Sequence, residues 1–252
     1  MDLGLTDKVA LVTGAASGLG RTIAELLAAE GARVGINYRT KPDHASDVVE
    51  RIRNGGGHAI KIGADLTSEE DIEAMFDRLE AELGTVDVLI NNAAYCPTSP
   101  VAELESGTFM HTMNVNLGGV FRCCQQFVKR LVAAGKTGRI VNISSQAAFR
   151  GSRSGKSAYD SSKLGVVGLT ISLARELAGK GFAVNCVAPG LMLTEMIADA
   201  VAADPDSFNK RVPLGRLGTT QEVANVAVFL ASERASYMTG ATVDVSGGLA
   251  MH

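Results

Sequence analysis

Tyr159 and Lys163 stand four residues apart in the stretch Ser-Ala-Tyr-Asp-Ser-Ser-Lys, residues 157–163. Positions i and i+4 of a helix lie on one face, so we expect the phenol and the ammonium to be neighbours. A free phenol has a pKa of about 10 and exchanges protons poorly at neutral pH. A nearby cation should lower that pKa by about 1–3 units. The pair predicts a general acid/base, although the same spacing also occurs on ordinary solvated helix faces.

A glycine-rich turn near the amino terminus predicts a site for the phosphates of a nucleotide. Residues 8–13 are typical of a buried strand, and residues 21–30 are typical of a helix that ends at Gly31. Backbone N–H groups and the positive helix end face an anion in this layout. The spacing is GxxxGxG rather than GxGxxG, and an ordinary βα turn is the alternative. The residues expected to contact the nucleotide are Gly14, Ser17, Gly18, Leu19 and Gly20.

The end of the second predicted strand, residues 33–37, bears on the choice between NAD and NADP. An NAD-binding domain commonly offers a carboxylate to the ribose 2′-hydroxyl here, whereas this chain has Asn-Tyr-Arg-Thr at 37–40. The first carboxylate after this strand is Asp43. A guanidinium suits the 2′-phosphate of NADP, which a carboxylate would repel. We therefore predict that Tyr38 and Arg39 favour NADP over NAD, with a solvated loop arginine as the alternative.

Short apolar runs alternate with helical stretches along the whole chain. Seven runs are expected to form strands, at 8–13, 33–37, 58–62, 86–90, 139–143, 183–187 and 242–246. This alternation predicts right-handed βαβ crossovers and a parallel sheet buried on both faces. The chain shows no linker, low-complexity tract or internal repeat. We therefore expect a single domain over residues 1–252, an α/β doubly wound Rossmann fold, with the ligand crevice at the carboxyl ends of the strands.

The composition argues against several classes of protein. The 252 residues are 46% hydrophobic and 20% charged, with a net charge of −3, and no basic stripe with interleaved aromatics suggests nucleic-acid binding. The amino terminus does not resemble a signal peptide, and no apolar run is long enough to span a bilayer. Cys96, Cys123, Cys124 and Cys186 lack metal-ligand spacing. We expect no metal site, and reduced thiols in a cytoplasmic protein.

Several motifs, in this order, resemble those of the single-domain branch of the short-chain dehydrogenase/reductase superfamily over essentially the whole chain. They are the glycine turn at 13–20, Asn-Asn-Ala-Ala at 91–94, Asn116, Ser145, Tyr159 with Lys163, and Pro189-Gly190 followed by Thr194. The resemblance implies a seven-stranded sheet of order 3-2-1-4-5-6-7 with helices on both faces and an NAD(P) cofactor. It implies a catalytic tetrad of Asn116, Ser145, Tyr159 and Lys163. It also implies a homotetramer or dimer in which the helix of Tyr159 packs on its twin.

The resemblance further implies which residues contact the cofactor. Besides the glycine turn they are Tyr38, Arg39, Asp65, Leu66, Asn92, Ala93, Tyr159, Lys163, Pro189, Gly190 and Thr194. The chain departs from the family's NAD users in having Tyr38-Arg39 in place of an acidic residue. Its stretch between Ser145 and Tyr159 is also slightly longer, which leaves Ser144 as a competitor of Ser145. We expect Ser145 to face inward, because it lies further past the end of its strand.

These groups suggest how a hydride could pass between a nicotinamide and a carbonyl carbon. Tyr159 is expected to exchange the proton of the substrate oxygen, with its pKa lowered by Lys163. Ser145 is expected to donate a hydrogen bond to that oxygen, worth about 2–4 kcal/mol if preorganised. Asn116 is expected to anchor a water chain between Lys163 and solvent, or alternatively to bond locally within its helix.

The segment between Ser145 and Tyr159 should border the substrate, because both its ends are catalytic. It carries Arg150, Arg153 and Lys156, three cations in a slightly acidic protein. We predict that one or more of them binds a carboxylate, sulfonate or phosphate of the substrate; cations solvated at the rim or facing another subunit are the alternative. Further candidates for the pocket wall are Tyr95, Cys96, Met192 and Met196, and residues 193–216 are a candidate lid.

Two enzyme functions remain open at this point. One is an NADP-preferring dehydrogenase of a sugar, sugar acid or other polar secondary alcohol or ketone, favoured by the basic segment and by Ile-Asn-Tyr-Arg at 36–39, which resembles some sugar dehydrogenases. The other is a 3-oxoacyl-thioester reductase, since basic residues would also suit an acidic acyl carrier protein. A nucleotide-sensing regulator without activity is a third function, and the intact tetrad argues against it.

Overall fold

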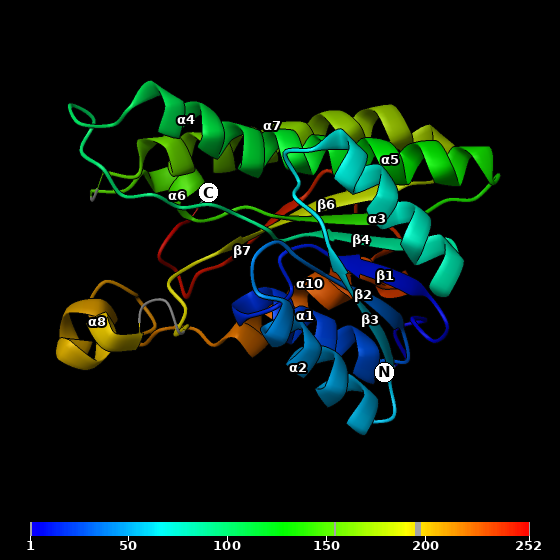
Figure 1. The fold of residues 1–252 in the computed structure, drawn as a ribbon. Coiled ribbons are helices and arrows are strands. Elements are labelled where there is room, and N and C mark those ends of the chain that lie inside the picture. The colour runs from blue at the N-terminus through cyan, green and yellow to red at the C-terminus, as the bar shows by residue number, and fades with distance from the viewer. Residues whose placement is uncertain (1, 154, 195–197, 252) are drawn as a thin grey trace.

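The computed structural model describes residues 2–153, 155–194 and 198–251 (Figure 1). Its centre is a seven-stranded parallel sheet of order β3-β2-β1-β4-β5-β6-β7, which confirms the predicted order. The strands are β1 (Val9–Val12), β2 (Arg33–Tyr38), β3 (His58–Gly63), β4 (Val88–Asn91), β5 (Arg139–Ile143), β6 (Ala183–Pro189) and β7 (Thr242–Val245).

The order of the strands reverses between β1 and β4. Val12 is paired with Ile36 of β2 on one side and with Ile90 of β4 on the other. The chain therefore builds outward from β1 to β3 and then returns to the centre to build the second half. In open parallel sheets the ligand crevice lies at such a switch point, beyond the carboxyl ends of the strands.

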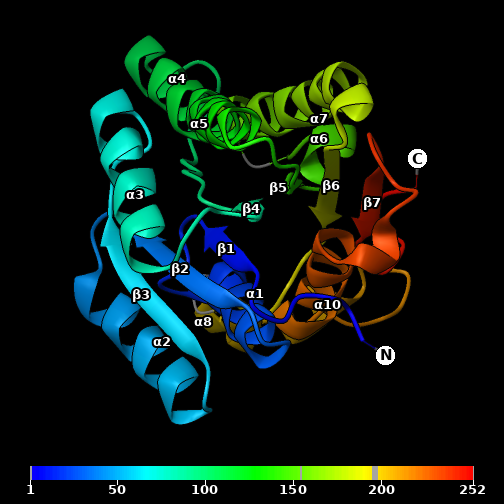
Figure 2. The same cartoon turned by 90° about the vertical axis from the view of Figure 1, so that its right-hand side faces the viewer.

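Helices cover both faces of the sheet (Figure 2). One layer contains α1 (Gly18–Ala29), α2 (Pro42–Asn54) and α10 (Thr220–Ala231), and the other contains α3 (Glu69–Glu82), α5 (Gly119–Ala133) and α7 (Ser157–Leu177). Each layer buries its own apolar cluster against the sheet, with Ile23 and Leu27 in the first and Phe76 and Phe127 in the second. Burial of both faces explains why the strands are continuous apolar runs rather than alternating ones.

The predicted helical region at 105–134 is interrupted where the site begins. It consists of α4 (Ser106–Met113), a π-helical turn (Asn114–Gly118) and α5. Asn116 lies within that turn with none of its surface exposed. Single π-helical turns inside helices are frequently found at functional sites.

The segment after β6 is more ordered than predicted. The candidate lid contains two short helices, α8 (Ala198–Ala203) and α9 (Pro205–Asn209), and its two ends are tied by Leu193 N donating to Gly218 O at 3.0 Å. It extends beyond the sheet on the same side as α6 (Ala147–Arg150) (Figure 1). Met196, a predicted wall residue, lies outside the described residues. None of the described helices has the length and apolar character that crossing a bilayer requires.

Candidate active site

Two asparagines hold the glycine-rich turn from neighbouring strands. Gly14 N donates to Asn37 Oδ1 at 3.1 Å, and Asn37 is buried at the end of β2. From the other side, Asn92 Nδ2 donates to the carbonyl oxygens of Thr13 and Gly14 at 3.0 and 3.1 Å. Asn92 thus binds the turn through the carbonyl oxygens of Thr13 and Gly14, and Asn37 binds it through the N–H of Gly14. Asn37 was not predicted to act in this way, although a polar residue closing a buried strand is a signal that could have revealed it.

The space in front of α1 fits the phosphates of a dinucleotide. Ser17 is the N-cap residue of α1, and its side chain makes no hydrogen bond to the first turn of the helix. Gly18 has a φ of +56°, and a Cβ built there would meet no atom within 4 Å. The first-turn N–H groups thus have no side-chain cap, and there is room beside Gly18, as the binding of an anion at a positive helix end requires.

Tyr38, Arg39 and Asp65 lie together at the ends of β2 and β3. Arg39 Nη1 is 3.9 Å from Asp65 Oδ2, and the two side chains are 48% and 38% exposed. Burial alone would raise the pKa of Asp65, but hydrogen bonds from Thr67 and the charge of Arg39 lower it below its usual value. Because an exposed ion pair at this distance is weak, the guanidinium remains available to a further anion.

The other predicted cofactor residues lie at the same edge of the sheet, after the strands that carry them; they are Ala93, Pro189, Gly190 and Thr194. Ala93 N donates to Thr13 Oγ1 at 3.1 Å, which joins the end of β4 to the end of β1. Leu19 and Leu66 are 8% and 6% exposed and pack into the two apolar clusters. Their side chains are therefore part of the core, and only their backbones remain for a cofactor.

Lys163 is enclosed beneath the crevice. It is 2% exposed, and its Nζ donates to Ile143 O at 2.7 Å. In the opposite direction, Ser144 Oγ donates to Lys163 O at 2.7 Å. These two bonds fasten α7 to the end of β5. Burial lowers the pKa of Lys163 to about 8, so the amine titrates near neutral pH.

Ser145 and Tyr159 face each other above Lys163. The Ser145 side chain is hydrogen-bonded to Tyr159, and Ser145 Oγ also accepts from Ala147 N at 3.1 Å. Lys163 Nζ lies 5.6 Å from the centroid of the Tyr159 ring. The structure therefore brings Ser145, and not Ser144, together with the phenol and the amine.

The expected lowering of the Tyr159 pKa by Lys163 is wrong for this structure. Burial first, and then the neighbouring Cys96, raise the pKa of Tyr159 above its usual value, and the hydrogen bond from Ser145 offsets only part of the rise. The amine lies against the ring and is itself buried, so the enclosure that depresses its own pKa also disfavours a phenolate. Tyr159 is thus held as the neutral phenol, the form that can donate a proton.

Asn116 joins the loop after β4 to the helix of Tyr159. Its Oδ1 accepts from Tyr95 N at 2.7 Å, and its Nδ2 donates to Tyr95 O and Ser162 Oγ, each at 2.9 Å. Ser162 Oγ in turn donates to Tyr159 O at 2.7 Å. The amide is therefore a brace across the site, and the water chain starting from Asn116 stays a prediction. Ser162 was not predicted, although it lies three residues after Tyr159 on the same helix.

The predicted substrate residues differ in how they lie. Arg150 and Arg153 are exposed, whereas Lys156 is half-buried at the N-cap of α7. Tyr95 is 37% exposed, and its ring meets His111 edge-on at a centroid distance of 5.3 Å. Met192 packs against the apolar cluster beneath α1 and α10. Of the three cations, only Lys156 is drawn into the protein.

Metal ligands are absent from the part of the chain that the structure describes: no group of three or more His, Cys, Asp or Glu side chains is arranged to hold an ion. The groups gathered at the carboxyl edge are instead a phenol, a hydroxyl, an amine and an open helix end. Such groups can bind a dinucleotide and move a proton beside it.

Comparison with known proteins identifies the family. A family model described as "Enoyl-(Acyl carrier protein) reductase" matches residues 14–250. The chain belongs to the short-chain dehydrogenase/reductase family. It is therefore an NAD(P)-dependent oxidoreductase that acts on CH–OH and C=O groups.

Relatives within the family have two kinds of name. The chain is 37% identical over 246 residues to the 3-oxoacyl-[acyl-carrier-protein] reductase of Staphylococcus epidermidis, covering 97% of this chain and 100% of that one. It is similar to a structure from Agrobacterium tumefaciens assigned as a gluconate dehydrogenase (TM-score 0.92, 35% identity, 99% and 98% covered). It is also similar to one assigned as a 2-deoxy-D-gluconate 3-dehydrogenase with bound NADP (TM-score 0.88, 37% identity, 98% of each chain covered). Family membership thus defines the reaction class and leaves the substrate to the details of the site.

Proposed function

We propose that this dehydrogenase acts on a sugar acid or another polar, anionic secondary alcohol or ketone and prefers NADP. The observation that carries the substrate class is the basic segment with Arg150, Arg153 and Lys156, which lies between Ser145 and Tyr159 in a chain of net charge −3. The gluconate-type names of the two Agrobacterium tumefaciens structures support it. Carboxylates are well matched by guanidinium and ammonium groups at the mouth of a site.

The proposed roles follow from the contacts of the side chains. A nicotinamide cofactor held at the glycine turn would supply a hydride in its reduced form, NADPH, and accept one in its oxidised form, NADP. Tyr159 donates its proton to the substrate oxygen during reduction and takes it back during oxidation, and Ser145 donates a hydrogen bond to the same oxygen. Lys163, whose pKa is lowered to about 8, restores the proton of Tyr159 and contacts the cofactor. Asn116 keeps the loop of Tyr95 and the helix of Tyr159 in register through its bonds at 2.7 and 2.9 Å.

The proposed cofactor preference depends on Arg39. Its guanidinium is 48% exposed and weakly paired with Asp65, so it can bind the 2′-phosphate of NADP. A family member whose structure contains NADP supports the proposal. NAD, which lacks that phosphate, would use the same site with lower affinity.

We further propose that the protein forms a homotetramer, or a dimer as the smaller assembly. Each chain would form a single domain, and the protein would be located in the cytoplasm. Phe121 on α5 and Leu164 and Ile171 on α7 are 45%, 51% and 43% exposed, and the two helices lie next to each other on one face (Figure 2). A second copy would cover these apolar side chains. The four cysteines are free thiols, in keeping with a reducing compartment.

The second candidate is a 3-oxoacyl-thioester reductase. The observation that favours it is the name of relatives that are 37% and 38% identical over nearly the whole chain, from Staphylococcus epidermidis and Aquifex aeolicus. In that case the basic segment would face the acidic surface of an acyl carrier protein.

A substrate panel followed by the absorbance of NADPH tests the proposal. D-gluconate, 2-deoxy-D-gluconate and D-glucose are assayed for oxidation with NADP and with NAD, and acetoacetyl thioesters are assayed for reduction with NADPH. We expect turnover of at least one acid and none of the thioesters, with kcat/KM higher for NADP than for NAD. Turnover of thioesters alone would establish the second candidate instead.

A further inference from the structure

The segment made of residues 151–153 and 155–156 is tied down at both of its ends. At the first end, Asp160 Oδ2 accepts from Ser152 N at 2.7 Å and Asp160 Oδ1 accepts from Ser152 Oγ at 2.9 Å. At the other end, Gly155 O accepts from Ser99 N at 2.8 Å. One brace comes from the first turn of α7 and the other from the loop after β4, so the segment is fixed to both walls of the crevice.

The second brace requires glycine. Gly155 has a φ of +68°, and a Cβ added there would lie 2.6 Å from Ser99 O. Two backbones can approach this closely only where no side chain stands between them. The contact brings the segment against the loop that carries Cys96, and it sets the direction in which the next residue, Lys156, leaves the segment.

Lys156 is directed inward by these braces. It is half-buried at the N-cap of α7, and its carbonyl accepts from Asp160 N at 2.8 Å. The charge of its ammonium acts on the Cys96 thiol, which also acts electrostatically on Tyr159 and Lys163. Lys156 thus begins one helical turn from Tyr159 and reaches the same part of the crevice.

The ammonium of Lys156 has no carboxylate within 4 Å among the described residues, although the charge of Asp160 acts on the same Cys96 thiol. No carboxylate there forms an ion pair with it, and the oxygens of Asp160 are occupied by Ser152. Burial raises the pKa of Cys96 even though the charge of Lys156 opposes the rise, so its neighbour is a neutral thiol. A half-buried cation that no described carboxylate contacts is costly, and an anion entering the crevice would relieve that cost.

We propose that Lys156 is the residue that recognises the negative charge of the substrate, and that Asp160 is its positioning residue. This rests on the proposed function and narrows it. Lys156 stands three residues before Tyr159, about 4.5 Å of helix rise, and both side chains interact electrostatically with the Cys96 thiol, so we place the anionic group within a few bonds of the reacting carbon. Short keto and hydroxy acids meet this condition, whereas the phosphate at the far end of a phosphopantetheine arm does not. Arg150 and Arg153, both exposed, attract the acid without holding it.

The test compares the most active acid of the panel with its primary amide, which has the same shape and no charge. In Lys156→Met, KM for the acid is expected to rise at least ~10-fold, because a charge-assisted contact is lost, while KM for the amide and for NADP changes less than ~2-fold. Lys156→Arg, which keeps the charge, restores KM for the acid. Lys180→Met, at the exposed far end of the same helical region, is the matched control and leaves all three values unchanged.

Asp160 is tested by the same comparison. Asp160→Asn should raise KM for the acid by about 3-fold to 10-fold and leave KM for the amide close to that of the wild type, since it weakens a charged acceptor without removing it. Ser152→Ala, which removes one of the two bonds from the other side, should give a smaller change of the same kind. Equal effects on acid and amide would show a merely structural role.

The outcomes separate the inference from the proposed function. If the wild type turns over an acid and Lys156→Met leaves KM for that acid unchanged, or raises acid and amide equally, the inference is wrong and the function stands. A wild type that turns over thioesters and no acid contradicts both. Should Lys156→Met fail to fold, Lys156→Gln takes its place, because it also removes the charge. The ratio of KM for the acid to KM for the amide, compared between Lys156→Gln and Lys156→Arg, then shows whether the charge of residue 156 is recognised.

Discussion

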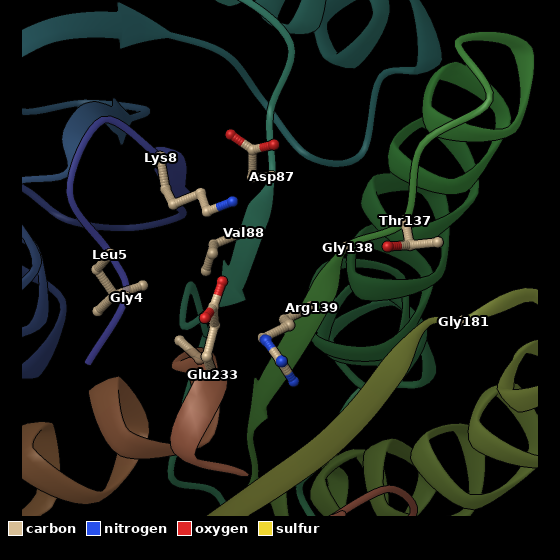
Figure 3. A pocket seen from close by; sticks show the side chains of 11 residues that line it. Gly4, Leu5, Lys8, Asp87, Val88, Thr137, Gly138, Arg139, Gly181 and Glu233 are labelled. Atoms are coloured by element: carbon tan, nitrogen blue, oxygen red, sulfur yellow. The ribbon is translucent and has the colours of Figure 1, made fainter. Parts of the chain in front are cut away.

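The two ends of the parallel sheet carry different kinds of polar groups. At the amino ends of the strands, Lys8, Asp87, Arg139 and Glu233 line a cavity of about 140 Å³. Figure 3 shows that these side chains come from the starts of three strands and from the turn after α10, with Glu233 beside Arg139. Burial lowers the pKa of Arg139, and the charge of Glu233 opposes the change. The cavity thus holds two formal positive and two formal negative charges, and Asp87 also accepts from Val9 N at the start of β1.

The carboxyl ends carry a different set of groups: the exposed pair of Arg39 and Asp65 after β2 and β3, and two lysines near Tyr159. Lys156 and Lys163 are at least partly buried there, and no carboxylate pairs with either among the described residues. Tyr159 and Ser145 are neutral, and the first turn of α1 has no side-chain cap. At the amino end, the polar groups interact with other groups of the protein and stabilise the fold. At the carboxyl end, hydrogen-bond donors and cations remain available to a ligand.

Tyr159→Phe gives the largest expected effect on the carboxyl end. The variant cannot give or take the proton of the substrate oxygen, so we expect kcat to fall at least ~100-fold. The affinity for NADPH, followed by cofactor fluorescence, should stay within about 3-fold of the wild type, because the phosphate site is untouched. Near-normal turnover in this variant would remove Tyr159 from the reaction.

Asp87→Ala tests the amino end, where the expected effect is on stability alone. Asp87 Oδ2 accepts from Val9 N at 2.9 Å, and its loss leaves the start of β1 without this acceptor. We expect the free energy of unfolding to fall by about 2 kcal/mol, with kcat unchanged within about 2-fold. Urea unfolding and steady-state kinetics measure both, and Asp47→Ala on the exposed face of α2 is the control. Lost activity in a folded Asp87→Ala protein would break the distinction between the two ends.

Arg39→Leu tests whether the carboxyl end of the sheet distinguishes NADP from NAD. Loss of the guanidinium should lower kcat/KM for NADP about 10-fold and leave kcat/KM for NAD nearly unchanged, since NAD has no 2′-phosphate. Arg51→Leu, an exposed arginine near the end of α2, serves as the matched variant and should change neither value. An equal loss with both cofactors would show that Arg39 does not read the 2′-phosphate.

The smallest effect concerns the core between the two ends. Burial raises the pKa of Cys124 from 9.0 to about 12. Between pH 9 and pH 12 the folded protein therefore keeps this thiol protonated, while the thiol of the unfolded chain loses its proton. The resulting stability is complete below pH 9 and is lost as the pH rises toward 12. Lys163, with its lowered pKa, acts in the opposite sense, so the wild type is compared with Cys124→Ala.

We compare the free energy of unfolding of the wild type with that of Cys124→Ala at the same pH. Between pH 8 and pH 10, the wild type should lose about 1 kcal/mol of this free energy relative to Cys124→Ala. Thermal unfolding at several pH values provides the measurement. Parallel pH profiles for the two proteins would mean that Cys124 does not titrate differently in the folded and unfolded states.

The parts of the fold that depend on local pattern were predictable. Residues 8–13 and 21–30 already show a strand and a helix around the glycine turn, and the alternation along the chain indicated a parallel sheet. The resemblance to the short-chain dehydrogenase/reductase superfamily, and not the alternation, implied the observed order of the seven strands. Tyr159 and Lys163 share a helix, so their proximity needs only the helical repeat. Ser145 was predictable because it is the second residue after the end of a strand, one residue further out than Ser144.

Other features depend on tertiary enclosure and could not be read from the chain. The π-helical turn at Asn116 arises where α4 and α5 meet the loop of Tyr95 and the helix of Tyr159. The raised pKa of Tyr159 results from burial, whereas the sequence displayed only a nearby lysine. The inward direction of Lys156 requires Ser99, which lies more than fifty residues away in the chain.

Amide hydrogen–deuterium exchange with and without NADPH tests most directly whether the carboxyl end of the sheet is the ligand site. We expect NADPH to protect the glycine turn at 14–20 and the loop at 92–96, and to leave residues 4–8 and 137–139 around the amino-end cavity unchanged. Protection of the amino-end residues with no change at the glycine turn would contradict this assignment.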